Sequence, residues 1–181
     1  LNELSTITKK LKFNNKKIVL CHGVFDLLHM GHIKHFQEAK KEGDILIVSI
    51  TADEFVHKGP NRPYFNTYLR LEALASISLI DYVTISNDVN AINVIKKLTP
   101  NIYFKGDEYK DNNRDVTGMI KKEKAAIKNV GGKIKFSDEI TFSSSAILNK
   151  FGKGLTLAQQ SLINKLKKKF SFSEIKKKID S

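Results

Sequence analysis

Hydrophobic residues in this chain form short continuous runs that alternate with helically spaced ones. Residues 16–23, KKIVLCHG, and 43–50, GDILIVSI, are apolar runs, which is typical of strands in a parallel sheet covered on both faces. Between them Ile33, Phe36 and Ala39 recur about one helical turn apart before a glycine, which predicts a helix that ends there. The pattern predicts a strand–helix–strand unit.

The alternation continues to about residue 137. Further strands are predicted at 81–86, 101–106 and 133–137, and further helices at 66–80, 89–98 and 116–132. Asn66 is a candidate cap for the first of these helices. Five strands alternating with helices predict a Rossmann-like, doubly wound α/β domain, with a five-stranded parallel sheet and helices on both faces. Such sheets bind ligands at the carboxyl ends of their strands, beside the point where the strand order reverses.

The pattern changes after residue 150, so residues 1–150 are predicted to form the main domain. Residues 151–181, the basic tail, carry apolar residues at helical spacing with eight lysines and two acidic residues between them. This predicts two short amphipathic helices that form an appendage or linker. The simpler interpretation is a solvated basic face packed on the domain or on a partner subunit, and the alternative is contact with a membrane or nucleic acid.

Composition fits one folded domain with an appendage. The chain has 181 residues, 41% hydrophobic and 28% charged, and half of its net charge of +12 lies in the basic tail. No apolar run approaches the ~20 residues needed to span a bilayer, and the N-terminal segment lacks the apolar centre of a signal peptide. The lone Cys21 precludes an internal disulfide and is expected to be buried. We expect a cytoplasmic protein. Since the chain begins at Leu, it could also be a piece of a longer polypeptide.

Candidate chemistry is concentrated in residues 23–32, GVFDLLHMGH. His29 and His32 are three residues apart where a strand gives way to a helix that starts close to Gly31, so both imidazoles can turn toward one spot. The helix start attracts anions through its unpaired N–H groups and its dipole, and a glycine lets a phosphate approach. Two imidazoles there could stabilise the charge that develops on a phosphorus centre during transfer.

Other interpretations of the histidines compete. One or both could cap the helix, or the segment could be a simple connection between strand and helix. They could also be metal ligands, since His29, His32 and His35 stand three apart and His22 is near. Successive three-residue steps drift around a helix by ~60°, however, and few acidic residues and no Cys join them.

The wider segment resembles a known family signature. GVFDLLHMGHIKHFQEAKKEGDILIVSI is similar to the cytidylyltransferase-like nucleotidyltransferase superfamily, whose members carry Gly-x-Phe-Asp at a strand end, then His-x-Gly-His, then a Gly-Asp strand. The similarity runs on in order to about residue 150, through KGPNRP, YLRLEAL, YFKGDEYK and TFSSSAI. The chain is similar to glycerol-3-phosphate cytidylyltransferases and to the nucleotidyltransferase domain of bifunctional heptose-phosphate enzymes.

The resemblance implies roles for individual side chains. His29 and His32 would hold the triphosphate and stabilise transfer at the α-phosphorus. Lys58 would bind phosphates from a loop, and Arg62 and Arg70 would bind substrate or phosphate. The ordinary alternatives are a solvated loop charge for Lys58 and, for Arg70, an arginine snorkelling at a helix edge.

The resemblance also implies a nucleotide site. Asp26 and Asp44 would lie near the active site and contact substrate, although a cap or turn role is equally compatible with them. The remaining nucleotide-binding positions would be Gly23, Val24, Phe25, Gly31, Gly106, Asp107, Ser143, Ser144 and Ser145. The three serines could equally cap a helix, and capping and phosphate binding can hold together.

The nucleotide stays open between CTP and ATP. Asp107 follows the cytidylyltransferase pattern and could accept a hydrogen bond from the exocyclic amine of cytosine, which slightly favours CTP, but adenine also offers an amine. Residues 138–141, DEIT, replace the Arg-Thr-Glu-Gly of glycerol-3-phosphate cytidylyltransferases, which favours a phosphosugar acceptor.

The resemblance further implies Mg²⁺, a homodimer, carbohydrate biosynthesis and fusion to a sugar-kinase domain. The expected reaction is NTP plus a phosphorylated sugar or polyol giving an NDP-linked product and pyrophosphate. Two other hypotheses are a basic module that binds nucleic acid or membrane through its tail, and a regulatory domain that binds nucleotide without turning it over.

Overall fold

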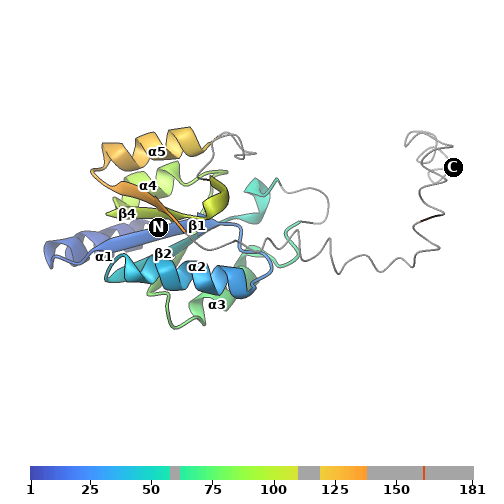
Figure 1. Ribbon diagram of the computed structural model, residues 1–181. Helices are drawn as coiled ribbons and strands as arrows, with labels where there is room; N and C mark the ends of the chain where they lie inside the picture. The colour runs from blue at the N-terminus through green and yellow to red at the C-terminus, as the bar shows by residue number, and fades with distance from the viewer. Residues whose placement is uncertain (58–61, 110–118, 138–160, 162–181) are drawn as a thin grey trace. The chain divides into compact units, whose positions relative to one another are not determined.

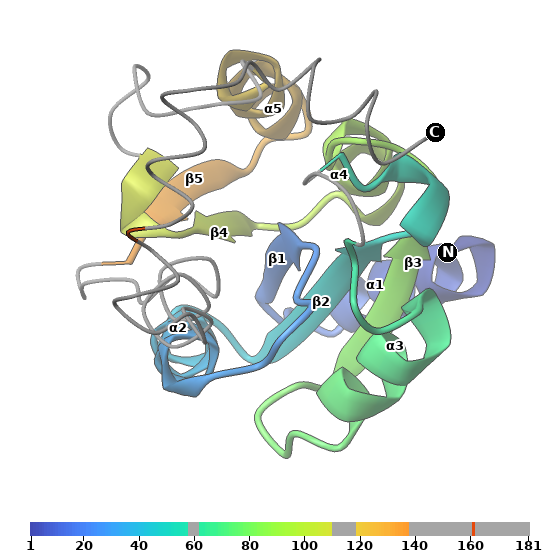
Figure 2. The same cartoon turned by 90° about the vertical axis from the view of Figure 1, so that its right-hand side faces the viewer.

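The computed structural model describes residues 1–57, 62–109, 119–137 and Ser161, and shows one parallel sheet with helices on both faces (Figures 1 and 2). The strands are β1 (Ile18–Gly23), β2 (Ile45–Thr51), β3 (Tyr82–Ser86), β4 (Ile102–Lys105) and β5 (Lys133–Phe136). The helices are α1 (Asn2–Phe13), α2 (Met30–Lys41), α3 (Thr67–Ala75), α4 (Ile92–Leu98) and α5 (Ile120–Asn129), with single 3-10 turns η1 (Asp53–Phe55) and η2 (Asp107–Tyr109). The predicted five-stranded α/β fold is therefore confirmed.

The strand order is β3-β2-β1-β4-β5, and every neighbouring pair is parallel. The chain runs outward from β1 through β2 to β3, then crosses back to β4 on the other side of β1 and continues to β5. The order therefore reverses between β1 and β4. In a doubly wound sheet, the crevice at the carboxyl ends of these two strands is where ligands bind.

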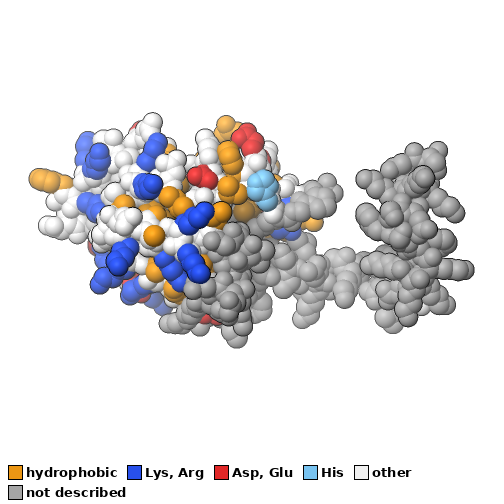
Figure 3. Space-filling model, turned by 90° about the horizontal axis from the view of Figure 1, so that it is seen from above, with side chains coloured by type: hydrophobic (Ala, Val, Ile, Leu, Met, Phe, Trp, Pro, Cys, Tyr) orange, Lys and Arg blue, Asp and Glu red, His pale blue; other side chains and the backbone are white. Residues whose placement is uncertain are grey.

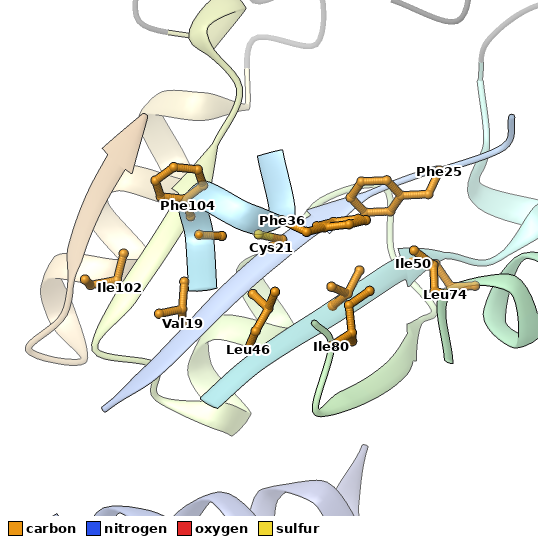
Figure 4. Close-up of a cluster of buried hydrophobic side chains, with 12 residues drawn as sticks. Val19, Cys21, Phe25, Phe36, Leu46, Ile50, Leu74, Ile80, Ile102 and Phe104 are labelled. Carbon is orange, nitrogen blue, oxygen red and sulfur yellow. The ribbon is translucent and has the colours of Figure 1, made fainter. Parts of the chain in front are cut away.

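Two hydrophobic cores fill the space between the sheet and its helices. The first lies between the sheet and α2 and α3, and contains Val19, Phe36 and Leu74 (Figure 4). Cys21 is also in this core and fully buried, as expected. The second lies on the opposite face, where residues of α1, α4 and α5 pack against Leu20 and Tyr103. Both faces of β1, β2 and β4 are covered, which explains why these strands are continuous apolar runs.

Helix α1 is an element that the sequence analysis missed. Leu4 and Thr8 are buried in it, and Ile7 and Leu11 pack against the second core. Lys12 Nζ donates to the carbonyl of Thr99 at 2.6 Å, which ties the helix to the end of α4. The apolar residues of this segment do recur at helical spacing, with lysines and threonines between them.

The helix boundaries agree with the caps in the sequence where caps exist. Asn66 Oδ1 accepts a hydrogen bond from the backbone N–H of Leu69 at 3.0 Å, so the predicted cap of α3 is confirmed. Helix α5 ends at Asn129 before a turn in which Gly131 has φ of +77°. A Cβ at Gly132 would lie 2.5 Å from the carbonyl oxygen of Pro100, so only glycine fits there.

Of the residues after 137, the structure describes only Ser161. Contacts divide the chain into unit Leu1–Ser144 and unit Ser145–Ser181, and the predicted amphipathic helices of the basic tail lie outside the described residues, so they and the boundary at 150 stay predictions. No helix in the described part of the chain is long and apolar enough to cross a membrane. The described surface in Figure 3 shows several Lys and Arg side chains and few acidic ones, in agreement with the positive net charge.

Candidate active site

The loop from β1 to α2 forms the centre of the candidate site. It leaves the sheet at Gly23, where a Cβ would lie 3.1 Å from the ring of Phe25, so a larger residue would displace that ring. Phe25 has φ of +49°, an unusual backbone conformation for a residue with a bulky side chain. Its ring is held between Phe36 and His32, at centroid distances of 5.2 and 5.4 Å. The loop is therefore held in a specific, strained shape beside the crevice.

The two histidines of the motif meet at the first turn of α2. His29 is the N-cap, and its Nδ1 accepts a hydrogen bond from the backbone N–H of Gly31 at 3.1 Å. The backbone N–H of His29 in turn donates to Nδ1 of His32 at 3.4 Å, and the rings stack with centroids 3.9 Å apart. The structure thus brings both rings together, and the capping interpretation describes part of what they do.

These caps also determine which ring nitrogen carries the proton. Because Nδ1 of both rings accepts a hydrogen bond, the proton of each neutral imidazole lies on Nε2. Burial lowers the pKa of His29 below its usual value, which favours this neutral form. Nε2 of His29 is buried and has no hydrogen-bond partner among the described residues. A buried donor of this kind calls for a ligand or ordered water.

Arg70 lies beneath the loop and is almost completely buried, at 1% exposure. Its guanidinium donates to the carbonyl oxygen of Val24, directly after β1, at 2.6 Å, and to that of Thr51, the last residue of β2, at 2.9 Å. It also donates to the carbonyl of Phe65 at 2.9 Å and pairs with Asp53 at 2.6 Å. The interpretation of Arg70 as a snorkelling surface arginine is therefore wrong. In this structure its donors are used to hold the strand ends and the loop before α3.

Asp26 and Arg62 form a second link between these loops. Asp26 Oδ1 accepts from the backbone N–H groups of Tyr64 at 2.8 Å and Phe65 at 3.0 Å. Its Oδ2 lies 2.9 Å from Nε of Arg62. Asp26 is buried: the two backbone donors occupy Oδ1, whereas Oδ2 faces Arg62 as an ion pair without a hydrogen bond of good geometry. The turn role foreseen as an alternative for Asp26 is what the described residues show, and Arg62 lies at the start of the same loop.

Asp44 does not lie near the active site, contrary to the expectation from the sequence. It directly precedes β2, and its carboxylate accepts from the backbone N–H of Lys17, directly before β1, at 2.7 Å. Both positions lie at the amino ends of parallel strands. The seven residues of β2 separate Asp44 from the carboxyl edge by roughly 20 Å. Asp44 therefore does not contact the site, and its role is to join the starts of two strands.

The end of β4 lies beside the end of β1, at the same edge of the sheet. Gly106 and Asp107 follow the strand directly, as the motif predicted, and the Asp107 N–H donates to Oγ of Ser137 at 3.1 Å. The carbonyl of Lys105 accepts from the backbone N–H of the same serine at 2.9 Å. Lys105 itself is buried, with Glu123 of α5 nearby. The sequence analysis overlooked Lys105, although a lysine that closes an apolar strand was a visible signal.

His22 and His35 contact other residues than the pair. His22 Nδ1 lies 3.0 Å from Oγ of Ser49, and burial together with Lys105 lowers its pKa to about 3. His35 packs against Phe36 and Phe104, and the same two causes lower its pKa to about 4. Both are neutral at pH 7. Within the ranges described above, no group of three or more His, Cys, Asp or Glu is placed to hold a metal ion. Lys58, Ser143, Ser144 and Ser145 lie outside the described residues.

Comparison with protein families gives a direct match. The model of the family described as cytidylyltransferase-like matches residues 20–150. Among curated proteins, the "Bifunctional protein HldE" of a Nitratiruptor species is 40% identical over 134 residues, which are 72% of this chain and 29% of that protein. The protein of the same name from Campylobacter jejuni subsp. jejuni serotype O:2 is 43% identical over 103 residues, 56% of this chain and 22% of that protein. The chain thus spans less than a third of the length of these relatives.

Solved structures agree on the fold. A lipopolysaccharide core biosynthesis protein from Thermoplasma volcanium has a TM-score of 0.56 at 23% identity, covering 71% of this chain and 99% of that one. A pantoate-beta-alanine ligase from Francisella tularensis has a TM-score of 0.53 at 19% identity, covering 90% and 74%. At these identities the likeness supports the Rossmann-like fold alone.

Proposed function

Because this chain belongs to the cytidylyltransferase-like family, whose members include nucleotidyltransferases, we propose that it transfers a nucleotidyl group from CTP or ATP to a phosphorylated sugar or polyol. A phosphate oxygen of the acceptor attacks the α-phosphorus, the bond between the α- and β-phosphates breaks, and pyrophosphate leaves. No covalent intermediate with the protein forms.

The observation that carries the proposal is the stacked pair of His29 and His32 at the start of α2. The Nε2–H of His29 is the donor left over by its cap, and it lies at the positive end of a 12-residue helix. Such a donor stabilises the negative charge that builds on the non-bridging oxygens as the α-phosphorus becomes five-coordinate. A neutral imidazole suffices for this role, in agreement with the lowered pKa of His29.

The other predicted residues complete the proposal. Gly23, Val24, Phe25 and Gly31 shape the loop around the phosphates. Lys58 and the serines 143–145 bind the triphosphate, and Arg62 binds substrate. Arg70 acts through its position beneath the loop. Gly106 and Asp107, at the end of β4, receive the base, for which CTP stays slightly preferred over ATP.

Substrate, metal and partners are also proposals. We propose that Mg²⁺ enters with the nucleotide, bound mainly by the phosphates, as is usual for this ion. The word "bifunctional" in the name of the relatives, together with the length of chain that they have beyond the match, supports a second domain in the whole protein, for which we propose the sugar kinase. A phosphosugar acceptor, a role in carbohydrate biosynthesis, a homodimer and a cytoplasmic location remain part of the proposal.

A screen of CTP, ATP, GTP and UTP against sugar and polyol phosphates, with Mg²⁺ and detection of pyrophosphate, tests the function. We expect release with one nucleotide and a narrow group of acceptors. Absence of pyrophosphate from every pair, with the nucleotide bound, would instead favour a regulatory domain. Salt-sensitive binding to nucleic acid or anionic vesicles that disappears without residues 151–181 would favour the basic binding module.

His29→Asn separates catalysis from capping. Asparagine is a good N-cap, so this variant keeps the start of α2 but lacks the Nε2–H donor. We expect turnover to fall by about 100-fold or more with the melting temperature nearly unchanged. His32→Asn serves as the matched variant for the second ring. Full turnover in both variants would show that the pair only caps the helix.

A further inference from the structure

Lys105 is a buried cation whose hydrogen-bonding capacity is not used within the described protein. It is the last residue of β4 and is 7% exposed. Its ammonium lies 4.0 Å from the ring centroid of Tyr109 and 5.5 Å from that of Tyr103. The nearest carboxylate oxygen of the described residues, Oε2 of Glu123, is 3.6 Å away, beyond hydrogen-bond length. Among the described residues, no acceptor lies within hydrogen-bond distance of Nζ.

Glu123 cannot move closer without breaking its own hydrogen bonds. Oε1 accepts from the backbone N–H of Ala91, at the start of α4, at 2.9 Å, and Oε2 accepts from the hydroxyl of Tyr103 at 3.0 Å. Glu123 is 4% exposed, and its carboxylate joins α4, α5 and β4. Glu123 therefore supplies Lys105 with a counter-charge but not with a hydrogen bond. An ammonium that is paired with a counter-charge but not hydrogen-bonded to it keeps donors that a ligand can use.

Lys105 lies at the edge of the sheet where ligands of this fold bind. Strand β4 lies directly beside β1, with Phe104 opposite Cys21, so Lys105 is level with the end of β1, where the loop to His29 and His32 begins. The charge of Lys105 contributes to the lowered pKa of both His22 on β1 and His35 on α2, which places the ammonium near these two elements. It thus lies at the edge of the sheet where the order of strands reverses.

We propose that Lys105 is a phosphate-binding residue, whose Nζ donates hydrogen bonds to a phosphate oxygen of a bound substrate. The proposal rests on the proposed function, since it takes nucleotide and acceptor phosphates as the anions of this site. Glu123 holds the ammonium in place when the site is empty, and the rings of Tyr103 and Tyr109 flank it. The phosphate can belong to the nucleotide or to the acceptor, and the chemistry of recognition is the same for both.

Direct binding to the full chain tests the proposal without requiring turnover. Titration calorimetry at fixed ionic strength would measure CTP, ATP, inorganic pyrophosphate and a panel of sugar phosphates against wild type, Glu123→Gln and the double variant Lys105→Met/Glu123→Gln. The double variant removes both charges, so no unpaired buried charge remains. The nucleotide and pyrophosphate arms report a nucleotide phosphate, and the sugar-phosphate arm reports the acceptor.

We expect the double variant to bind at least one of these ligands about 10- to 100-fold more weakly, the range for one charged hydrogen bond. Glu123→Gln, which keeps Lys105 and removes only its counter-charge, should bind as tightly as wild type or more tightly. If the double variant does not fold, Lys105→Gln compared with Glu123→Gln gives the same contrast. Unchanged affinity for every ligand without Lys105, or a wild type that binds none of them, would overturn the proposal. Loss of affinity without pyrophosphate release by wild type would uphold Lys105 and refute the proposed reaction.

Discussion

Replacing Arg70 by methionine should remove the strongest link between the strand ends beneath the candidate site. Methionine keeps most of the length and apolar volume of the side chain but has no donor. The carbonyls of Val24, Thr51 and Phe65 would each lose a hydrogen bond of 2.6–2.9 Å from a side chain that is 1% exposed.

The size of the effect follows from these contacts. A buried acceptor left without a partner costs about 1–3 kcal/mol, so three carbonyls set a range of roughly 3–9 kcal/mol if none regains water. Asp53 adds little, because its side chain is 41% exposed and can be hydrated again. Since some carbonyls at strand ends will regain water, we expect a loss of about 3–5 kcal/mol, as for breaking other buried pairs. That is a large part of the roughly 5–15 kcal/mol typical of a domain.

Urea unfolding followed by far-UV circular dichroism measures this loss, since the chain contains no tryptophan for fluorescence. Arg70→Lys keeps the charge but lacks the planar fork that reaches three carbonyls, so its loss should be smaller but still clear. Lys9→Met on the exposed face of α1 is the control, and should change the free energy of unfolding by no more than about 0.5 kcal/mol. If Arg70→Met lost less than about 1 kcal/mol, the guanidinium would not be the link described.

Three further outcomes are expected. The pKa of His35 is about 4 in the folded chain and 6.5 when unfolded. The unfolded state therefore binds more protons between these pH values, and stability should fall as the pH is lowered through them. His35→Leu should reduce the slope of unfolding free energy against pH, and an unchanged slope would show that His35 does not cause this pH dependence. Asp26→Ala leaves two backbone donors without an acceptor, so we expect the free energy of unfolding to fall by about 2–4 kcal/mol and hydrogen exchange at Tyr64 and Phe65 to become faster. Exchange as slow as in wild type would show that Asp26 does not hold these two N–H groups. Asp44→Asn should leave kcat and KM for pyrophosphate release unchanged, because Asp44 lies at the amino edge of the sheet. A large change in either constant would show that Asp44 contributes to the active site.

Local patterns in the sequence were enough to predict the layers and the centre of the site. The strands of a doubly wound sheet are buried on both faces, so their composition alone reveals them. The cap of α3 by Asn66 and the meeting of His29 and His32 depend on residues three apart, and helix geometry determines such contacts. The resemblance to the cytidylyltransferase-like family was carried by the same short segments, and the family match confirms it.

Contacts between distant segments could not be read in this way. Asp44 was expected near the active site because it matches an acidic position of the family signature, yet a residue before a parallel strand lies at the opposite edge from residues after it. Arg70 was read as a ligand-binding or surface arginine, because nothing in its helix shows that the carbonyls of Val24 and Thr51 converge on it. Helix α1 was missed because its narrow apolar stripe gains meaning only against α4.

The sequence by itself thus determined the strands and helices that follow α1, their alternation and the histidine pair, since these depend on neighbours within one or two turns of the chain. Tertiary structure decided which strand ends share an edge and which charges are paired. Lys105 is the clearest example: its counter-charge comes from Glu123, 18 positions further along the chain on another element. Only the packing of α5 against β4 shows that this pairing leaves Lys105 Nζ without a hydrogen-bond acceptor in the described part of the chain.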